Sequence, residues 1–523
     1  MKTQILFTIL IIFFVASSNF SQETTSEPFN FVVNDFQIDN AMSIYENTEA
    51  KNAIDGNGNS IIVWEDVREG AKDIFAQRIS DNGTLLGSNF MVNEILDSTN
   101  CELPTVAMNK SGESVVVWVA GTTEFGITKL DIWAQPFSSE GGPLGDNILV
   151  SGALDFDFLY EPVVALDASG NFVVVWRGGD YGNSNLFARH YFADGTPVGD
   201  TQIICDKPRH QFLPAIAMKE NGDFILAWSD ERVGNPKIYA QQFNADITPV
   251  KEDFLVYEKS SSTWQMDPEI GLNPSGDFVI AWVQGFDNSD ILAQQFSGDG
   301  TRQGETFQVN KNVAASEMRT LYKVVMNDDG SFLIGWRDQY DTRLMPKTNI
   351  ESNSYNKPLG AHMLLFIRRF TKSGQAIGDP FSPTMTDAFR FHSIDFKVLD
   401  NQIYNVWTEE NGVFANILEM ESVSGDIAGN FSQLVEEFKL NQNFPNPFNP
   451  VTEISYTTAS MENVTLKIYD ILGREIRTLV NAVQPAGFHS VLFQGKNLPS
   501  GTYFYELRAG KHFVERRKMV LAK

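Results

Sequence analysis

The sequence predicts an all-β protein, a seven-bladed β-propeller of four-stranded blades followed by a small β-sandwich. Three observations predict this fold. A strand that ends in tryptophan recurs seven times, glycine turns separate short apolar runs throughout the chain, and the last part of the chain reverses the sign of charge. The composition agrees, because 40 Phe and 39 Gly among 523 residues indicate short strands and many turns.

The N-terminal residues predict a secretory signal peptide. An apolar run from Ile5 to Ala16 follows the single cation Lys2 and precedes small residues. The run is shorter than the ~20 residues that span a bilayer, and no later run approaches that length, so the sequence predicts no transmembrane segment. The first cysteine is Cys101, which excludes a lipid-modified cysteine at the mature N-terminus. We assign residues 1–21 to the signal peptide and expect an exported protein.

The tryptophan repeat predicts the architecture of most of the chain. Seven segments align on a tryptophan that ends an apolar run, at spacings of 54, 58, 52, 54, 54 and 71 residues. The seven tryptophans are Trp64, Trp118, Trp176, Trp228, Trp282, Trp336 and Trp407. A recurrence at this period predicts one supersecondary unit per repeat. The longest spacing contains an insertion at residues 341–361.

Each repeat has the same order of strands. A short apolar strand such as Pro104–Met108 precedes the tryptophan strand, and a glycine turn joins the two. A charged loop leads to a third strand such as Asp73–Ile79, and another glycine turn leads to a fourth such as Phe90–Asn93. Four strands per unit without helical periodicity indicate a propeller blade, and the continuous VVVW-type runs suit strands that are buried on both faces.

The two ends of the repeat region predict how the propeller closes. The segment Phe31–Asn34 precedes the first repeat and has the pattern of a fourth strand, whereas the last repeat stops after a third strand, Gly412–Met420. We therefore expect the N-terminal strand to complete the seventh blade, which removes an exposed sheet edge. An open solenoid would leave that strand without a role. The predicted propeller spans 28–425, and a linker spans 426–438.

The chain contains two cysteines, Cys101 and Cys205. In the repeat register they lie between different pairs of blades, so we expect unpaired thiols. Export permits a disulfide, and a bond between them is the alternative.

Polar loops after the tryptophan strands supply the candidate ligand-binding residues. A ring of carboxylates, arginines and tyrosines at the mouth of the channel suits a polar ligand or a cation. The candidates are Glu65, Arg177, Asp180, Tyr181, Glu231, Arg337, Tyr340, Glu409 and Glu410. Asp66, Asp230 and Asp338 instead recur two residues after tryptophan, and we interpret them as loop caps or as partners of Arg68 and Arg232. A ligand site breaks repeat symmetry, whereas a blade motif obeys it.

The sequence contains no recognisable catalytic, metal or cofactor motif. The six histidines lack metal-ligand spacing, and Asp55–Asn59 lacks the remaining ligands of a calcium loop, so we interpret that segment as a turn. We predict no metal, no cofactor and no catalytic residue. A glycosidase nevertheless needs only two carboxylates that the fold brings together, which Glu65, Asp180, Glu231 or Glu410 would supply.

The chain changes character after residue 438. Residues 439–523 hold 11 Lys and Arg against 6 Asp and Glu, so the first 438 residues keep 29 and 60 of the chain's 40 and 66. Alternating strands such as Val464–Asp470 and Gly501–Gly510, with glycine turns between them, predict a small β-sandwich. We predict a separate module over 439–523.

Four sequence motifs distinguish this module from a general β-sandwich. They read NQNFPNPFNPVT (Asn441–Thr452), IYDILGREIRTLV (Ile468–Val480), NLPSGTYFYELRAG (Asn497–Gly510) and KMVLAK (Lys518–Lys523). The module resembles, in order and over its whole length, the type A sorting domain of the type IX secretion system. The resemblance implies an immunoglobulin-like fold related to a flagellar hook-capping domain. It further implies passage through the periplasm, recognition by the outer-membrane translocon, and a secreted or cell-surface location. It also implies sorting residues: Gly473 and Gly501 in tight turns, and recognition residues from Lys518 to Lys523.

Two functions fit these predictions. The first is a secreted or surface-displayed module that binds a glycan or a protein, and the second is an extracellular hydrolase that acts on polysaccharide. The propeller repeat, W-x-D-x-R followed by D-I-x-A-Q, is similar to repeats of secreted bacterial proteins, and only the architecture follows from that. A formal net charge of -26 disfavours nucleic acid, whose phosphates repel an acidic protein. The expected partners are the type IX translocon and surface polysaccharide or another extracellular ligand, and we expect a monomer.

Overall fold

The computed structural model describes residues 29–39, 49–68, 71–94, 99–124, 127–152, 156, 158–180, 182–258, 263–285, 289–311, 318–340, 362–381, 393–409, 412–420, 438–440, 443, 448, 451–458, 462–484, 487–496, 498–510 and 513–521. Every regular element in these ranges is a β-strand, and none of them contains a helix long and apolar enough to cross a membrane. The expected signal peptide, the insertion at 341–361 and all but the last residue of the expected linker lie outside the described residues.

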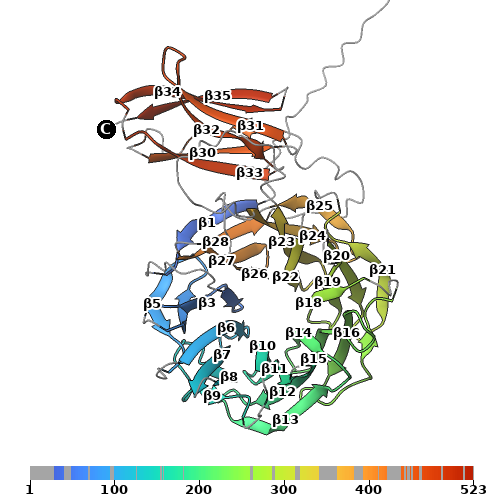
Figure 1. Cartoon of the computed structure of the whole chain (residues 1–523). Coiled ribbons are helices and arrows are strands. Elements are labelled where there is room, and N and C mark those ends of the chain that lie inside the picture. The colour runs from blue at the N-terminus through green and yellow to red at the C-terminus, as the bar shows by residue number, and fades with distance from the viewer. Residues whose placement is uncertain are drawn as a thin grey trace, which may run out of the picture.

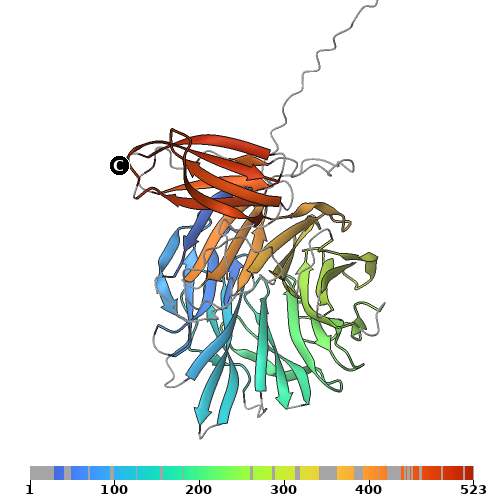
Figure 2. The same ribbon diagram turned by 45° about the horizontal axis from the view of Figure 1, so that its top comes forward.

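Seven four-stranded antiparallel sheets surround a central axis as the blades of a propeller (Figure 1). The predicted all-β, seven-bladed fold is confirmed. In six blades the strands are neighbours in the order in which the chain makes them, from the strand nearest the axis to the outermost strand. The view in Figure 2 shows the strands of the blades side by side around the axis.

The strands of the blades have the following bounds. Blade 1 contains β2 (Ala50–Ile54), β3 (Ser60–Asp66), β4 (Asp73–Ile79) and β5 (Leu85–Met91). Blade 2 contains β6 (Thr99–Met108), β7 (Ser114–Glu124), β8 (Ile127–Phe137) and β9 (Ile148–Leu149). Blade 3 contains β10 (Phe158–Leu166), β11 (Phe172–Asp180), β12 (Asn183–Tyr191) and β13 (Pro197–Cys205). Blade 4 contains β14 (Gln211–Met218), β15 (Phe224–Asp230), β16 (Lys237–Phe243) and β17 (Phe254–Leu255). Blade 5 contains β18 (Gln265–Leu272), β19 (Phe278–Gln284), β20 (Asp290–Phe296) and β21 (Arg302–Gln308). Blade 6 contains β22 (Met318–Met326), β23 (Phe332–Tyr340), β24 (His362–Phe370) and β25 (Ala376–Phe381). Blade 7 contains β26 (Ile394–Leu399), β27 (Gln402–Glu409), β28 (Gly412–Met420) and β1 (Phe29–Gln37).

The second strand of each blade forms the core between neighbouring blades. In β3 and β15 every residue is buried, as the continuous apolar runs predict. All seven repeat tryptophans have exposed fractions of 1% or less, so their predicted burial is confirmed. Cys101 on β6 and Cys205 on β13 are buried and unbonded.

Four blades repeat one aromatic pair between the second and third strands. The ring centroids are 4.8–5.0 Å apart and the planes lie within 12° of parallel. The pairs are Phe172 with Tyr191, Phe224 with Phe243, Phe278 with Phe296, and Phe332 with Phe370. Directly opposed aromatic side chains stabilise antiparallel strands. The Phe-rich composition therefore has a specific place in the blade.

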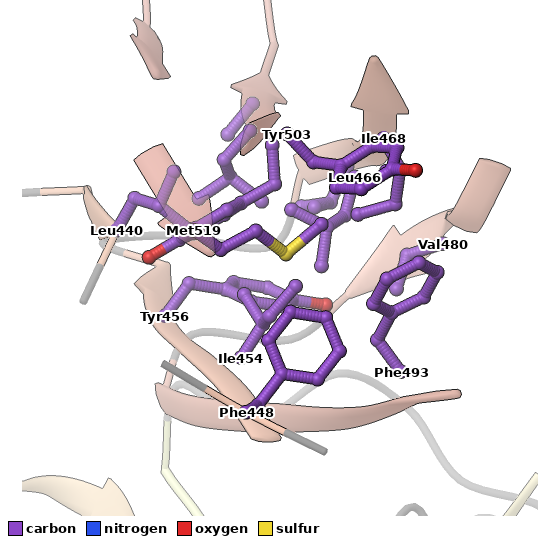
Figure 3. Close-up of a cluster of buried hydrophobic side chains, with 14 of the residues drawn as sticks. Leu440, Phe448, Ile454, Tyr456, Leu466, Ile468, Val480, Phe493, Tyr503 and Met519 are labelled. Carbon is purple, nitrogen blue, oxygen red and sulfur yellow. The ribbon is translucent and has the colours of Figure 1, made fainter. Parts of the chain in front are cut away.

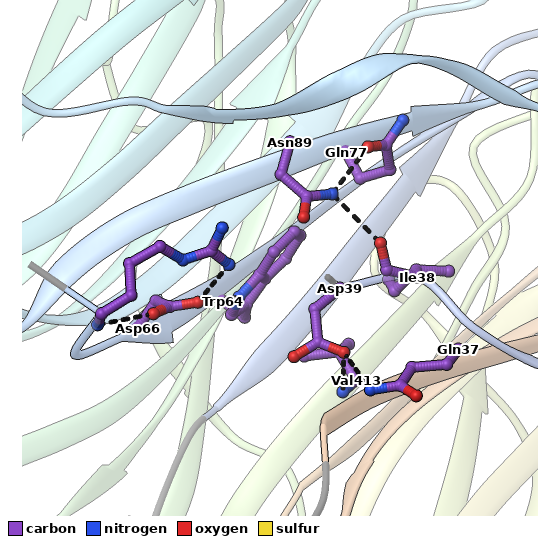
Figure 4. Close-up of polar contacts among 9 residues, drawn as sticks. Gln37, Ile38, Asp39, Trp64, Asp66, Gln77, Asn89 and Val413 are labelled. Atoms are coloured by element: carbon purple, nitrogen blue, oxygen red, sulfur yellow. Dashed lines mark hydrogen bonds and ion pairs between the residues drawn. The ribbon is translucent and has the colours of Figure 1, made fainter. Parts of the chain in front are cut away.

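Strand β1 closes the ring of blades. It pairs antiparallel with β28 at the outer edge of blade 7, with Phe31 opposite Leu418. After β1, the Ile38 N–H donates to the Val413 carbonyl at 2.9 Å, and the Asp39 carboxylate accepts N–H groups from Gln37 and Val413 (Figure 4). The predicted closure of blade 7 by the N-terminal strand is confirmed.

The C-terminal module consists of two sheets that face each other across one core (Figures 2 and 3). One sheet contains β29 (Lys439–Leu440), β30 (Val451–Thr458) and β33 (Gly487–Gln494). The other contains β32 (Glu475–Gln484), β31 (Glu462–Tyr469), β34 (Gly501–Ala509) and β35 (Phe513–Leu521). Leu440, Phe448 and Ile454 pack with Leu466 and Met519 between the sheets. The predicted immunoglobulin-like β-sandwich is confirmed.

Candidate functional site

The structure places the predicted loop residues in different environments. The side chain of Glu65 is buried and links two blades, because its carboxylate accepts the N–H of Leu103 at 2.8 Å and lies 3.3 Å from Lys72 Nζ. Burial raises the pKa of Glu65, and the Leu103 N–H and Lys72 oppose that shift. Asp180 is exposed at the end of β11, and Glu231 follows β15 with a half-buried side chain.

Two arginines of the predicted set lie in blades 3 and 6. Arg177 pairs with Glu161 at 3.2 Å, and its guanidinium lies 5.1 Å from the centre of the Phe158 ring. Arg337 is half-buried on β23 and acts electrostatically on the carboxylate of Asp267 in the next blade. These five loop residues belong to blades 1, 3, 4 and 6.

The structure describes less of the remaining predicted loop residues. Tyr340 and Glu409 are the last residues of β23 and β27, and the structure describes only their backbone. Tyr181 and Glu410 lie outside the described residues. A role of the nine loop residues in ligand binding stays a prediction.

The aspartates that recur after tryptophan stabilise the blade. Asp66 accepts the indole N–H of Trp64 at 3.1 Å and the backbone N–H of Arg68 at 2.8 Å, and it also pairs with the Arg68 guanidinium (Figure 4). Asp230 makes the same contacts with Trp228 and Arg232 in blade 4. These bonds support the interpretation of the repeated aspartates as loop-stabilising residues.

The aspartate of blade 6 uses a different partner. Asp338 pairs with Arg319 of β22 at 2.9 Å, and both side chains are buried. The arginine therefore comes from the neighbouring strand instead of the same loop.

The innermost strands of four successive blades contain a bulge just before a proline. One extra residue interrupts the pairing there, and the residue before proline has a left-handed backbone. These residues are Leu103, Glu161, Leu213 and Asp267, with φ of 54°, 55°, 50° and 59°. A bulge turns the side chains near it away from the regular pleat, and left-handed conformations of residues other than glycine cluster at functional sites.

Two of these bulges are held by a carboxylate of the preceding blade. Glu65 accepts the N–H of Leu103, and Glu161 accepts the N–H of Leu213 at 2.6 Å. Glu65 and Glu161 therefore have clear structural roles. Asp267 differs, because its own carboxyl group lies among charged side chains of other blades.

A single repeat position on the innermost strands breaks the symmetry of the propeller. Each blade has one residue opposite the residue that precedes its tryptophan. From blade 1 to blade 7 these residues are Lys51, Thr105, Val163, Ala215, Glu269, Lys323 and Asp395. We call this set the axial ring. Blades 2 to 4 contribute small or apolar residues, whereas blades 5, 6, 7 and 1 contribute charges of alternating sign.

The position two residues closer to the hairpin turn breaks the repeat in one blade. Six blades have Ala, Gly or Val there, and blade 7 has Lys397. We call Asp267, Lys397 and the four charged residues of the axial ring the axial charge cluster. Glu269 lies 3.4 Å from Lys323, and Asp395 lies 3.2 Å from Lys397.

The axial charge cluster is in contact with solvent. The side chains of Lys323, Glu269 and Lys397 are 30%, 25% and 21% exposed. Asp395 is more deeply buried and accepts the backbone N–H of Asn52 at 3.1 Å, so it also joins blade 7 to blade 1. The cluster is therefore partly exposed and partly buried.

Burial and mutual interaction shift the pKa values in the cluster. Burial raises the pKa of Asp267 to about 7, and repulsion from Glu269 adds to this shift. Burial lowers the pKa of Lys397 to about 8, against the attraction of Asp395. The pKa of Lys323 is raised, chiefly by Glu269, and the pKa of Asp395 is lowered because Lys397, Lys323 and Lys51 outweigh its burial.

The repeat alignment contained the signal for the axial ring. The first strands read PTVAM, EPVVAL, PAIAM and PEIGL, and Glu269 is the residue of the last motif that departs from the apolar pattern. The predicted site residues lie after the tryptophans and do not include Glu269. No group of three or more His, Cys, Asp or Glu side chains is placed to hold a metal ion in the parts of the chain that the structure describes.

The predicted sorting residues lie at the surface of the C-terminal module. Gly473 has a φ of 77° in the turn between β31 and β32, where Asp470 accepts the N–H groups of Leu472 and Arg474. Gly501 begins β34, and Lys518 is exposed on β35. Lys523 lies outside the described residues. Recognition of these residues stays a prediction.

Comparison with solved structures finds proteins that resemble the chain distantly. A protein of unknown function from Dyadobacter fermentans is 10% identical, with a TM-score of 0.42 over 75% of this chain and 100% of its own. A PL25 ulvan lyase bound to -[GlcA(1-4)Rha3S]- is 11% identical, with a TM-score of 0.47 over 76% and 98%. The propeller domain of the trilobed protease from Pyrococcus furiosus is 9% identical, with a TM-score of 0.40 over 72% and 99%. Likenesses of this size assign no activity or substrate.

The comparison with families identifies the C-terminal module. No curated protein matches the chain. Residues 442–522 match the model of the secretion system C-terminal sorting domain. The module is therefore the sorting domain of a type IX secretion substrate, and it directs the protein to the cell surface or the extracellular space.

Proposed function

We propose that this protein is an exported binding module that recognises a polar extracellular ligand, a glycan or a protein segment, at the axial charge cluster. The single observation that carries the proposal is the asymmetry of the axial ring. A repeat protein needs only its repeated contacts to fold, and residues that violate the repeat at an accessible position are expected to serve function.

The energetics of the cluster favour a functional role. Removing a charge from water costs free energy, and a buried ion pair often stabilises a fold less than apolar residues of the same size. Blades 2 to 4 contain Thr105, Val163 and Ala215 at this position, so a blade can fold with an uncharged residue there. The charges of the other four blades are therefore better explained by a ligand than by stability.

Binding is favoured over hydrolysis by the state of the carboxylates. Glu269 and Asp395 are each paired with a lysine, and the pKa of Asp395 is lowered. A carboxylate with a lowered pKa, as in Asp395, is a poor proton donor at neutral pH. The two lysine–carboxylate pairs of the cluster therefore suit recognition of a charged or hydroxylated ligand.

Hydrolysis is the second candidate function, because Asp267 favours it. A carboxyl group with a pKa of about 7 is suited to general acid catalysis near neutral pH. Glu269 lies two residues away on the same strand and would have to act as the second carboxylate. Incubation of the full chain with polysaccharides, followed by an assay for new reducing ends, tests this function.

A glycan array and a peptide array probed with the full chain test the binding function. The ligand found is then titrated by calorimetry against the double variant Lys51→Gln/Lys323→Gln. We expect the affinity to fall at least about tenfold, which corresponds to ~1.4 kcal/mol. The matched control is Lys110→Gln, whose side chain is 66% exposed and paired with Glu220 away from the axial ring. Equal affinities of the double variant and the wild type would overturn the proposal, provided that both melt at similar temperatures.

A further inference from the structure

The axial charge cluster holds three lysines and three carboxyl groups, so its charges balance, whereas the propeller as a whole is strongly acidic. The first 438 residues carry 29 Lys and Arg against 60 Asp and Glu. Around Asp267, in contrast, two cations, Lys51 and Arg337, act on its carboxyl group together with the carboxylates of Glu269 and Glu161. Lys323 and Lys397 add two further cations close by, each paired with one carboxylate.

Among the acidic groups of this region, Asp267 is positioned by its backbone conformation, whereas Glu269 and Asp395 each pair with a lysine. It occupies the bulge of β18 with a φ of 59°, and Pro268 follows it. Proline fixes its own φ and restricts the residue before it, so the carboxyl group has little freedom to turn away from its neighbours. In the bulges of blades 2 and 4 the same position is Leu103 or Leu213, which bears no charge.

The charged groups that face Asp267 come from four strands. Glu269 lies on the same strand, Lys51 on β2, Glu161 on β10 and Arg337 on β23. Glu161 is itself paired with Arg177. Deprotonated Asp267 offsets part of the positive charge of Lys51 and Arg337, and protonated Asp267 leaves that charge available to an anion.

We propose that the axial charge cluster binds an anionic sugar, one with carboxylate or sulfate groups, and that Asp267 takes up a proton when this ligand binds. The inference rests on the proposed binding function and adds to it the class of ligand and a dependence on pH. Lys51, Lys323 and Arg337 attract the anion, and neutral Asp267 no longer repels it.

The direction of the pH dependence follows from linkage. A bound anion raises the pKa of Asp267 above its value of about 7 in the free protein, because a second negative charge disfavours the carboxylate. The bound state therefore holds more protons than the free state. Affinity is highest below pH 7 and falls as the pH rises from the pKa of the free protein to the higher pKa of the complex.

Calorimetry of the full chain tests both parts of the proposal. The probes are an oligogalacturonate, a sulfated carrageenan oligosaccharide and a neutral cello-oligosaccharide. We expect one or both anionic probes to bind and the neutral probe not to bind. At pH 7.5, titrations in two buffers of different ionisation enthalpy should show a net uptake of protons. For a pKa shift of one unit, from about 7 to about 8, the affinity of the wild type should fall about sixfold from pH 6.5 to pH 8.5.

The variant Asp267→Asn tests whether Asp267 is the group that takes up the proton. Asparagine has nearly the shape of the neutral acid and tolerates the left-handed backbone. The variant should bind the anionic probe at pH 8.5 as tightly as the wild type does at pH 6.5, without proton uptake. Uptake that persists in the variant would assign the proton to Lys397, whose pKa is about 8, and would overturn the role of Asp267.

The outcomes separate this inference from the proposed function. Tight binding of the neutral probe that the Lys51→Gln/Lys323→Gln variant weakens would retain the axial site and overturn the anionic ligand. Anion binding without proton uptake by the wild type would overturn the coupling, and this result does not depend on whether a variant folds. Anion binding that survives the double variant would place the ligand elsewhere and refute the proposed function as well.

Discussion

The repeat tryptophans show at the scale of the residue how this sequence specifies its blades. Each indole is buried between neighbouring blades, and in blades 1 and 4 its N–H donates to the aspartate two residues later. The same residue thus fills the core and fixes the start of the charged loop. In blades 1 and 4 the tryptophan and the aspartate therefore stabilise each other.

Replacement of one tryptophan measures this packing. We expect Trp228→Ala to lower the free energy of unfolding by ~3 to 5 kcal/mol, because the variant loses apolar burial and leaves a cavity. The measurement is urea denaturation of the full chain followed by circular dichroism. Trp264 is 41% exposed and is not a repeat tryptophan, so Trp264→Ala is the matched control. A cost below about 1 kcal/mol for Trp228→Ala would contradict the packing role.

The buried aspartate of the blade motif predicts a pH dependence of stability. The Arg68 and Trp64 hydrogen bonds outweigh the burial of Asp66 and lower its pKa below the usual 3.8. A lowered pKa in the folded state adds stability above the pKa of the unfolded chain, and that stability is lost as the pH falls through the folded pKa. We expect Asp66→Asn to cost about 1 to 3 kcal/mol at pH 7.

The difference between the wild type and Asp66→Asn should shrink in acid. Urea titrations from pH 7 down to pH 3 provide the measurement. Asp223→Asn is the control, since Asp223 is half exposed in a turn and lies 3.9 Å from Lys219. A difference that stays constant over this range would show that Asp66 contributes through shape instead of charge.

The residues of the candidate site were less predictable than the residues of the core. The repeat predicted which tryptophans are buried, because burial follows directly from an apolar run. The axial ring depends on which side of the first strand lies nearest the axis, and a bulge before proline sets that direction in blade 5. Glu269 departs from the apolar pattern of the first strands in the sequence, but its place beside Lys323 depends on the pairing register.

The strands of the blades followed the sequence pattern closely at the scale of the element. The third strand of blade 1, predicted as Asp73–Ile79, has these bounds in the structure. The fourth strands were harder to predict, because they are short and exposed. In blades 2 and 4 only two residues of this strand pair, in β9 and β17.

Strand β32 of the sorting domain was not predicted as a strand. It contains the residues EIRTLVNAVQ, and its first four residues are exposed. Because these four residues are exposed, a pattern of buried apolar residues does not reveal the strand in the sequence. Its pairing with β31, which includes two register shifts, holds it in the sheet.

Because β1 closes the ring of blades, a short deletion that removes this strand should have a large effect. Removal of residues 29–37 would leave the outer edge of β28 without its partner, although blade 7 keeps its other three strands. We expect a lower melting temperature of the full chain and association through the exposed edge. Thermal unfolding and size-exclusion chromatography measure the two effects.

A point variant in the same strand serves as the control for that deletion. The side chain of Val32 is 44% exposed, so Val32→Thr should leave both measurements unchanged. A deletion variant that melts like the wild type and stays monodisperse would show that three strands suffice for blade 7.

The division of charge separates two modules at the scale of the whole molecule. The sorting domain has a hydrophobic core of its own, whose members all lie between Leu440 and Leu521. It holds more Lys and Arg than Asp and Glu, whereas the propeller is strongly acidic. A module with its own core and its own charge is expected to fold independently and to be recognised independently.

Export provides the test of this separation. We expect deletion of residues 439–523 to leave a folded propeller in the periplasm, because the translocon no longer finds the sorting domain. Fusion of residues 439–523 to an unrelated periplasmic protein should bring that protein to the surface or into the medium. Cell fractionation with antibodies against both passengers is the measurement, and a cytoplasmic marker controls for lysis. If the truncated propeller reached the medium at the wild-type level, the C-terminal module would be a stabilising appendage and its sorting role in this protein would be refuted.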